Sequence, residues 1–236
     1  MSRPSVRRAL RRAGAAPPPR PPRGEGLRNL GRIPPPKIFL PGETEDAGPV
    51  DFSAVFGRVA PVEMEIGVGK GRFLLAAAAT HRDRDWFGVE IEPEYAQIVR
   101  LKAARAGLLN LRIERIDGKA FVERRLSPGC LAGLHVYFPD PWPKKRHHKR
   151  RLVEPAWAEA AARALAPGRL LRVTSDHEEY FSVIDAVLSR EPLLEKLSPE
   201  EAGNWSTGTS YELKFLKTGR PIYKAVFRRL APRAAG

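Results

Sequence analysis

Short apolar runs alternate with longer amphipathic segments along most of the chain. The short runs predict strands at 62–67, 86–90, 111–116, 131–138 and 170–174, and an alternating run predicts a late strand at 222–227. The longer segments predict helices over 72–81, 93–106, 156–165 and 178–188. Pro93 suits the first turn of its helix. Pro167-Gly168 should end the helix before it.

The alternation of strands and helices predicts an α/β domain with a mostly parallel central sheet and helices on both faces. Ligands of such sheets bind outside the carboxyl ends of the strands. Several polar or glycine positions fall at or just after those ends, namely Gly67, Glu90, Asp117, Asp140 and Asp176. We therefore expect a ligand site along this edge.

The chain has 236 residues, of which 42% are hydrophobic, which is enough for one sizeable core. Residues 1–50 are rich in Pro, Arg and Gly, so they cannot bury enough apolar surface to fold alone. We expect a disordered basic arm over 1–50, one domain over 51–230 and a short tail over 231–236.

The net charge of +14 favours a polyanionic partner, either nucleic acid or an anionic membrane surface. The first 23 residues contain seven arginines and no acid, yet the remainder is also basic. The charge therefore belongs to the domain as well as to the arm.

A single cysteine, Cys130, cannot form an internal disulfide and indicates a reducing compartment. We expect it to be a packing residue. No apolar run approaches the length of a membrane span, and no signal-peptide core follows the start. These features predict a cytoplasmic protein.

The turn after the first strand, Gly67-Val68-Gly69-Lys70-Gly71, lets a ligand approach the backbone closely. Its spacing is G-x-G-x-G, with Arg72 where a dinucleotide fingerprint has its third glycine. No phosphate-binding P-loop is present in the sequence. The turn therefore favours S-adenosylmethionine over NAD.

Acids follow the next two predicted strands. Glu90 lies where nucleotide-binding sheets place a carboxylate that accepts hydrogen bonds from ribose, and Glu92 is the competing candidate. Asp117 could accept the exocyclic amine of adenine, or it could cap the helix after it.

The segment 137–151 carries the most information. Pro139 and Pro141 fix the backbone around Asp140, and Trp142 offers a flat face beside the carboxylate. Eight basic or imidazole residues follow, from Lys144 to Arg151. Such a turn can hold a nucleic-acid base while the run neutralises phosphates. No third ligand accompanies the adjacent histidines of the run, so we expect no metal site.

The segment PDPWPKKRHHKRRL resembles the signature of the bacterial tRNA (guanine-N7-)-methyltransferase family. Residues 64–71 resemble the first motif of that family, and Thr209-Ser210-Tyr211-Glu212 resembles its late T-x-Y-E motif. The resemblance runs from Val62 to Arg228 and leaves the arm outside. Ser175 stands where the family pattern has threonine.

The resemblance implies a class I Rossmann-like, S-adenosylmethionine-dependent methyltransferase that acts on guanine 46 in the variable loop of tRNA. The cofactor site would be lined by Glu65, Gly67, Gly69, Glu90, Asp117 and Asp140. The substrate would be contacted by Lys144, Asp176, Thr209, Ser210, Tyr211 and Glu212. The RNA would be contacted by Arg146, His147, His148, Lys149, Arg150 and Arg151.

Guanine N7 has an in-plane lone pair and no proton, so its methylation needs no general base. Alignment of donor and acceptor is then the main requirement. We expect Asp140 to stabilise the positive charge that develops on the guanine ring. Asp176 or Glu212 could hold the guanine edge through its N1 and N2 hydrogens.

Three other interpretations stay open. The chain could methylate another RNA base or a protein, or it could bind RNA on a scaffold that has lost its cofactor. A basic membrane-surface protein is the third, although no strongly amphipathic helix accompanies the charge run. The oligomeric state, monomer or homodimer, is also open.

Overall fold

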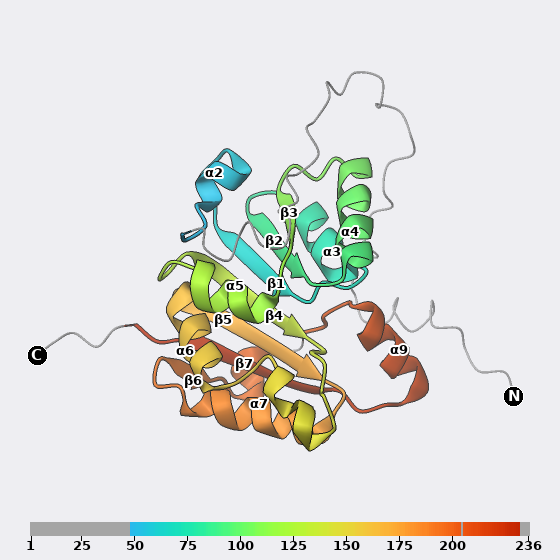
Figure 1. Ribbon diagram of the computed structural model, residues 1–236, viewed down its shortest axis with the longest axis vertical. Coiled ribbons are helices and arrows are strands. Elements are labelled where there is room, and N and C mark those ends of the chain that lie inside the picture. Colours follow the sequence, from blue (N-terminus) through green and yellow to red (C-terminus); the bar gives the residue numbers. More distant parts are fainter. Residues whose placement is uncertain (1–47, 204, 232–236) are drawn as a thin grey trace, which may run out of the picture. The chain divides into compact units, whose positions relative to one another are not determined.

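The structure is a computed structural model that describes residues 48–203 and 205–231, so almost all of the predicted arm and tail lie outside it. Its described part forms one seven-stranded sheet with flanking helices (Figure 1). The strands are β1 (Val62–Ile66), β2 (Asp85–Glu90), β3 (Leu111–Arg115), β4 (Leu131–Tyr137), β5 (Leu165–Ser175), β6 (Leu194–Lys196) and β7 (Tyr223–Arg229). The helices are α2 (Phe52–Phe56), α3 (Arg72–Thr80), α4 (Pro93–Arg105), α5 (Gly118–Arg125), the 3₁₀ helix η2 (Lys145–Arg150), α6 (Pro155–Ala164), α7 (Glu178–Arg190), α8 (Pro199–Ala202) and α9 (Ser210–Thr218).

The strand order is β3-β2-β1-β4-β5-β7-β6. Strands β1 to β5 pair in parallel, and β7 enters antiparallel between β5 and β6. The mostly parallel sheet predicted from the sequence is confirmed. The strand order reverses between β1 and β4, and ligands of doubly wound sheets bind at such a reversal.

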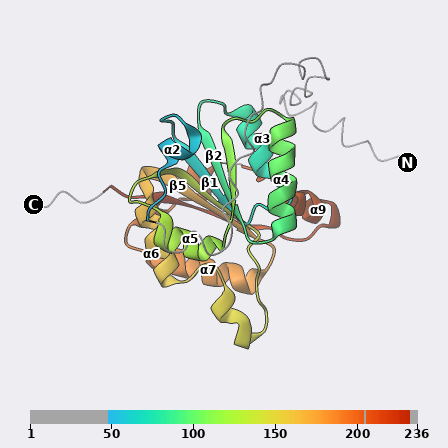
Figure 2. The same cartoon turned by 45° about the horizontal axis from the view of Figure 1, so that its top comes forward.

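Two hydrophobic clusters hold the helices against the sheet. The larger lies against α5, α6 and α7, where Met64, Leu134 and Trp157 are fully buried. The smaller joins β2 and β3 to α3 and α4 through Leu74, Trp86 and other residues. Figure 2 shows α3 and α4 on the opposite side of the sheet from α5, α6 and α7. The predicted helix layers on both faces are therefore confirmed.

Local sequence explains where several helices begin. Pro93 occupies the first turn of α4, where its missing N–H costs nothing. Ser198 and Glu201 form a reciprocal capping box at α8. Thr209 caps α9 by accepting a hydrogen bond from the backbone N–H of Glu212.

The expectation that Pro167-Gly168 ends the helix before it was wrong. Helix α6 ends at Ala164 and runs directly into β5, so this dipeptide lies inside the strand. The pairing of β4 with β5 shifts register there, and Gly168 has a φ of 78°. A bulge thus accommodates the dipeptide. Regular pairing resumes at Leu170, where the sequence predicted the strand to begin.

Cys130 is partly buried and packs against the larger hydrophobic cluster, as predicted. Burial raises the pKa of its thiol to about 11, so the thiol stays protonated at neutral pH. In the described ranges, no helix combines the length and apolar character that a membrane span requires.

Gly71 gives a direct test of the packing between the first turn and α4. It has a φ of 71°, and a Cβ atom there would lie 2.5 Å from Cγ2 of Val99. Gly57 has a similar φ of 73° and open space around it. We predict that Gly71→Ala lowers the free energy of unfolding by about 1–3 kcal/mol more than Gly57→Ala, because only position 71 is overpacked.

Urea unfolding of the two variants measures that difference. Adding Val99→Ala to Gly71→Ala should recover part of the loss by making room for the new methyl group. Equal losses in the two glycine variants would contradict the proposed contact.

Candidate active site

A cavity of about 850 Å³ opens at the carboxyl ends of β1, β2 and β4. It lies at the reversal of strand order, where the fold predicts a ligand. Its wall includes every residue expected at the cofactor site, namely Glu65, Gly67, Gly69, Glu90, Asp117 and Asp140. Helix α9, which lies at this edge in Figure 1, contributes Ser210 and Tyr211.

The glycine turn is held in a conformation that other residues rarely adopt. Gly67 and Gly69 have φ angles of 72° and 50°. The backbone N–H of Gly69 donates to Oε2 of Glu90 at 2.7 Å, which fastens the turn to the end of β2. Glu90 lines the cavity, whereas Glu92 stands at the N-cap of α4 outside the lining. The sequence left these two acids open, and only Glu90 faces the cavity.

Glu65 is a buried carboxylate in the cavity wall, with 2% of its surface exposed. Burial, and secondarily the nearby charge of Glu90, raise its pKa well above the usual value. Its Oε2 atom is buried and has no hydrogen-bond partner within the described chain. Such an atom is costly to leave unpaired, so it suits a ligand that brings a hydrogen-bond donor.

Asp117 caps helix α5, which was one of the two roles that the sequence left open, and its contact with adenine stays a prediction. Its Oδ1 accepts hydrogen bonds from the backbone N–H groups of Lys119 at 2.7 Å and Ala120 at 3.3 Å, which caps α5. The residue also lines the cavity. The cap fixes the carboxylate in place at the end of β3.

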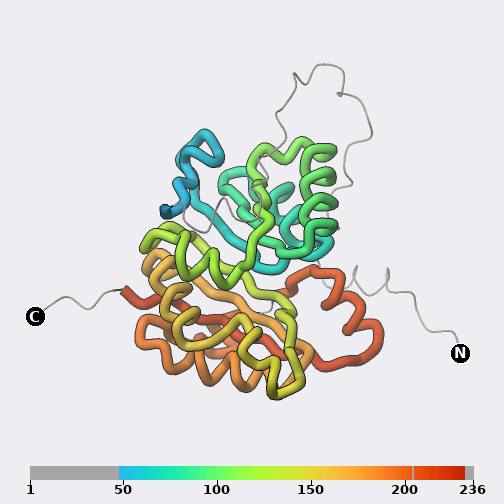
Figure 3. The backbone as a smooth tube through the Cα atoms, in the orientation of Figure 1, coloured from blue at the N-terminus to red at the C-terminus, as the bar shows by residue number. Residues whose placement is uncertain are grey.

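The acidic turn that follows β4 is strained at both of its ends. Phe138 has a φ of 55° and Trp142 a φ of 44°, a region that bulky residues avoid. Between them, Asp140 is exposed and lines the cavity. Figure 3 traces the long connection from β4 through this turn to α6.

Arg151 anchors the acidic turn to helix α7. Its Nε donates to the carbonyl oxygen of Pro141 at 2.9 Å, and its two terminal nitrogens donate to Glu179 of α7 at 3.0 and 2.6 Å. Its guanidinium also lies 4.7 Å from the ring centre of Tyr180. Only 5% of Arg151 is exposed.

The expectation that Arg151 contacts RNA therefore fails. Its Nε and both terminal nitrogens are already bonded to Pro141 and Glu179, and its side chain is buried. The other basic residues of the run lie on or beside η2, which projects from the sheet and its helix layers in Figure 2.

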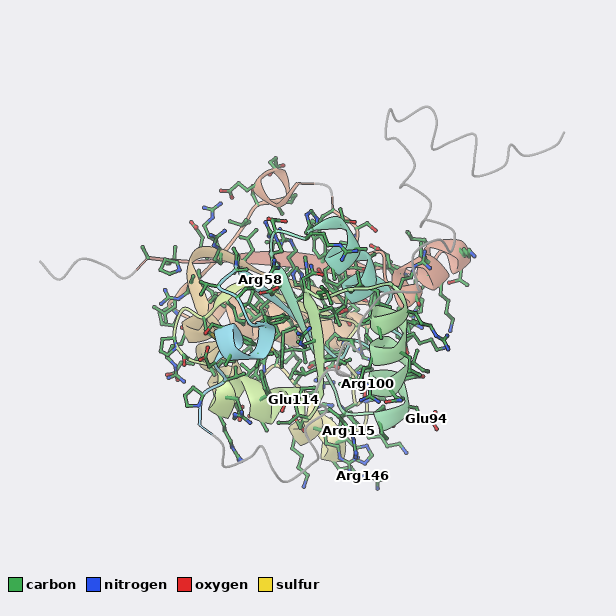
Figure 4. The ribbon with its side chains drawn as sticks, turned by 90° about the horizontal axis from the view of Figure 1, so that it is seen from above. Arg58, Glu94, Arg100, Glu114, Arg115 and Arg146 are labelled. Carbon is green, nitrogen blue, oxygen red and sulfur yellow. The ribbon has the colours of Figure 1, made fainter. Side chains whose placement is uncertain are left out.

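Within that run, Lys149 and Arg150 line the cavity, and Arg150 lies 5.0 Å from the ring centre of Trp142. Arg146 is exposed on η2 (Figure 4). The cavity wall does not include Lys144, Arg146, His147 or His148, which lie beyond it on and beside η2. The run thus forms a basic rim, of which two side chains reach the cavity.

The T-x-Y-E motif divides between the cavity and the core. Thr209, Ser210 and Tyr211 line the cavity, and the ring of Tyr211 lies 5.9 Å from that of Phe138. Glu212 is only 1% exposed and does not reach the cavity, contrary to the expected substrate contact. Its carboxylate accepts from Lys224 and from the loop before Thr209, so it shapes that loop instead.

Asp176 is also outside the cavity wall. It pairs with Arg220 at 2.8 Å, and 18% of its side chain is exposed. Neither Asp176 nor Glu212 therefore belongs to the described cavity wall.

Several cavity residues were missed by the sequence analysis. Tyr137, Phe73 and Tyr95 line the cavity, as do Arg72 and Lys214. Tyr137 ends β4, so the rule that ligands meet strand ends could have found it. The others project from helices, where sequence alone gives no such signal.

The comparisons with known proteins agree on one family. Residues 59–225 match the family described as putative methyltransferase. The tRNA (guanine-N(7)-)-methyltransferase of Alkalilimnicola ehrlichii is 36% identical over 77% of this chain and 78% of its own length. That of Thiobacillus denitrificans is 35% identical over 97% of both chains. The similarity therefore extends into most of residues 1–50, which were expected to lie outside it.

Solved structures share the fold at lower identity. The 16S rRNA methyltransferase KamB has a TM-score of 0.54 and 18% identity over 79% of this chain and 96% of its own. The antibiotic-resistance methyltransferase Kmr has a TM-score of 0.53 and 20% identity over 77% and 92%. Both support the Rossmann-like methyltransferase fold. By the match over residues 59–225 and the identity with these relatives, the chain belongs to the tRNA (guanine-N(7)-)-methyltransferase family.

Proposed function

We propose that this chain is a cytoplasmic enzyme that transfers a methyl group from S-adenosylmethionine to N7 of guanine 46 in the variable loop of tRNA. The observation that carries the proposal is the single cavity that joins the glycine turn to Asp140 and to the basic rim. The names of the relatives support tRNA as the substrate class. The resemblance of the acidic turn to the family signature supports guanine 46 as the methylated position.

The cavity fits the proposed cofactor. Gly67 and Gly69 leave open space over the backbone, as an adenosyl group requires. Glu90 and Asp117 supply acceptors for ribose hydroxyls and for the adenine amine, and a carboxylate already bonded to a backbone N–H retains further lone pairs. The unpartnered Oε2 of Glu65 suits the ammonium group of the methionine part, whose positive charge would offset the burial that raises the pKa of Glu65.

S-adenosylmethionine supplies an electrophilic methyl group, so that the S–CH₃ bond breaks as the bond to guanine N7 forms and S-adenosylhomocysteine remains. The chain contributes alignment first, because in-line approach dominates such a transfer. Tyr211 and Trp142 present flat faces at the cavity, on which a guanine ring can stack. The basic rim holds the tRNA backbone.

Asp140 supplies the electrostatic contribution. Positive charge appears on the guanine ring as the methyl group arrives, and a fixed carboxylate stabilises it without reorganising. The strained turn holds Asp140 at the cavity, with Pro139 and Pro141 on either side. No proton has to leave N7, so Asp140 acts as a charge and not as a base.

The experiment that tests the function combines the purified chain with labelled S-adenosylmethionine and unmodified tRNA, followed by mapping of the label by cleavage at N7-methylguanine. We expect one product at guanine 46, and no product with a tRNA that carries adenine there. Label at another base or on protein would overturn the substrate. A folded chain that transfers no label would favour an RNA-binding protein without catalysis.

Asp140→Asn keeps the shape of the side chain and removes its charge. We predict that kcat for tRNA methylation falls by roughly 10²- to 10³-fold, as for other preorganised electrostatic groups. Affinity for S-adenosylhomocysteine, measured by calorimetry, should change much less. Glu159→Gln on α6, which removes only an exposed ion pair with Arg163, is the control. Near-normal turnover in Asp140→Asn would remove this role.

Arg150 and Arg151 are adjacent in sequence and should behave differently. We predict that Arg150→Ala weakens tRNA binding. The slope of the logarithm of the binding constant against the logarithm of salt concentration (the salt slope) should fall by about 1, because one phosphate contact is lost. Arg151→Ala should leave the slope unchanged and lower kcat, because the acidic turn loses its anchor. Fluorescence binding titrations at several salt concentrations measure the slope. A reduced slope in Arg151→Ala would contradict its internal role.

A further inference from the structure

The sheet face that carries Glu65 also holds a hydrogen-bonded row of buried polar side chains that the proposed chemistry does not use. Glu63 of β1 and His135 and Tyr137 of β4 are 7%, 4% and 6% exposed. Nε2 of His135 lies 2.7 Å from Oε2 of Glu63, and Nδ1 lies 2.7 Å from the hydroxyl oxygen of Tyr137. Arg84 approaches the other oxygen of Glu63 at 2.5 Å.

With a neutral imidazole, the hydrogen bonds among Glu63, His135 and Tyr137 allow one order of protons. Burial raises the pKa of Glu63, but hydrogen bonds from His135 and Arg84 outweigh burial and leave that pKa below its usual value. Burial lowers the pKa of His135, although the hydrogen bond with Glu63 opposes that shift, and the lower pKa favours the neutral imidazole. Its one proton is then on Nε2, where the carboxylate of Glu63 accepts it. Nδ1 is left as an acceptor for the O–H of Tyr137.

The sheet leaves room for the buried carboxylate. Gly133 of β4 lies opposite Glu63 of β1 in the register. A Cβ atom at position 133 would lie 2.3 Å from Oε2 of Glu63. Glycine therefore allows the carboxylate to lie over β4 and reach His135. Arg84, with 33% of its side chain exposed, is the member of this row that lies at the surface.

Tyr137 connects this row of hydrogen-bonded side chains to the cavity. Tyr137 belongs to the cavity wall, and its ring packs against Phe73 at 4.9 Å and Trp205 at 6.0 Å between ring centres. Tyr137 is also the last residue of β4, directly before the strained Phe138. Fixing the phenol therefore fixes the strand end from which the acidic turn departs.

We propose that Arg84, Glu63 and His135 form a relay of hydrogen bonds that orients Tyr137 and thereby positions the turn 138–142 for methyl transfer. His135 is a positioning residue in this proposal, because it touches neither substrate nor cofactor. The kinetic part of the proposal rests on the proposed function. The hydrogen-bond order does not, so it can be tested separately.

The first measurement is a long-range ¹⁵N–¹H correlation spectrum of the ¹⁵N-labelled full chain at neutral pH. The resonances of His135 are assigned by their loss in His135→Gln. We expect a neutral ring with the proton on Nε2. A doubly protonated ring, or a proton on Nδ1, would overturn the relay. This result does not depend on whether the chain methylates tRNA.

The second measurement is the single-turnover rate of methyl transfer to tRNA. Glutamine has one amide donor and one amide acceptor, so His135→Gln can restore the order of hydrogen bonds. We expect it to retain at least about a third of the rate. His135→Leu should lose about 10- to 100-fold, the range expected for small misplacements of reacting groups.

Tyr137→Phe removes only the hydroxyl and keeps the pair of Glu63 and His135. It therefore tests the positioning role even if His135→Leu does not fold. We expect a loss of about tenfold in rate with unchanged tRNA affinity. His81→Gln, at the exposed end of α3, is the control and should match the wild-type rate. Full activity in Tyr137→Phe, or equal losses in His135→Gln and His135→Leu, would overturn the positioning role. An inactive wild-type chain would instead refute the proposed function.

Discussion

Two bulky residues held at positive φ, Phe138 and Trp142, are the constraint around which the site is built. Each such conformation costs on the order of 1–3 kcal/mol and persists only where its surroundings fix it. Here the surroundings are specific: Phe138 donates its N–H to the carbonyl oxygen of Thr174 at 2.9 Å, and Arg151 binds the carbonyl oxygen of Pro141. Asp140 lies between these two fixed residues and lines the cavity.

The two faces of the sheet serve different purposes. The face toward α5, α6 and α7 is apolar and supplies most of the hydrophobic stabilisation. The opposite face carries five buried polar residues on neighbouring strands, namely Glu63, Glu65, Glu90, His135 and Tyr137. Buried polar groups cost stability unless they are paired, and most of these groups are paired with one another or with backbone. The exception, Oε2 of Glu65, lies in the cavity wall, where a ligand can complete it.

Sequence patterns predicted the parallel sheet and the strand ends that carry Gly67, Glu90 and Asp140, because periodicity and strand-end acids are local signals. They could not predict which arginine of a continuous basic run turns inward, since Arg151 is distinguished only by its contacts with Pro141 and α7. They also missed the partner of Glu212, because Lys224 lies on the antiparallel strand β7. The pair of Glu63 and His135 spans 72 residues of sequence, so only the strand order brings the two together.

In the proposed complex, the cofactor, the guanine and Asp140 share one cavity at the reversal of strand order. A crystal structure of the full chain with S-adenosylhomocysteine tests this claim most directly. We predict that the ligand lies over Gly67 and Gly69, with its ribose at Glu90 and its sulfur facing the turn 138–142. A ligand bound outside this cavity, or one whose sulfur points away from Asp140, would contradict the account.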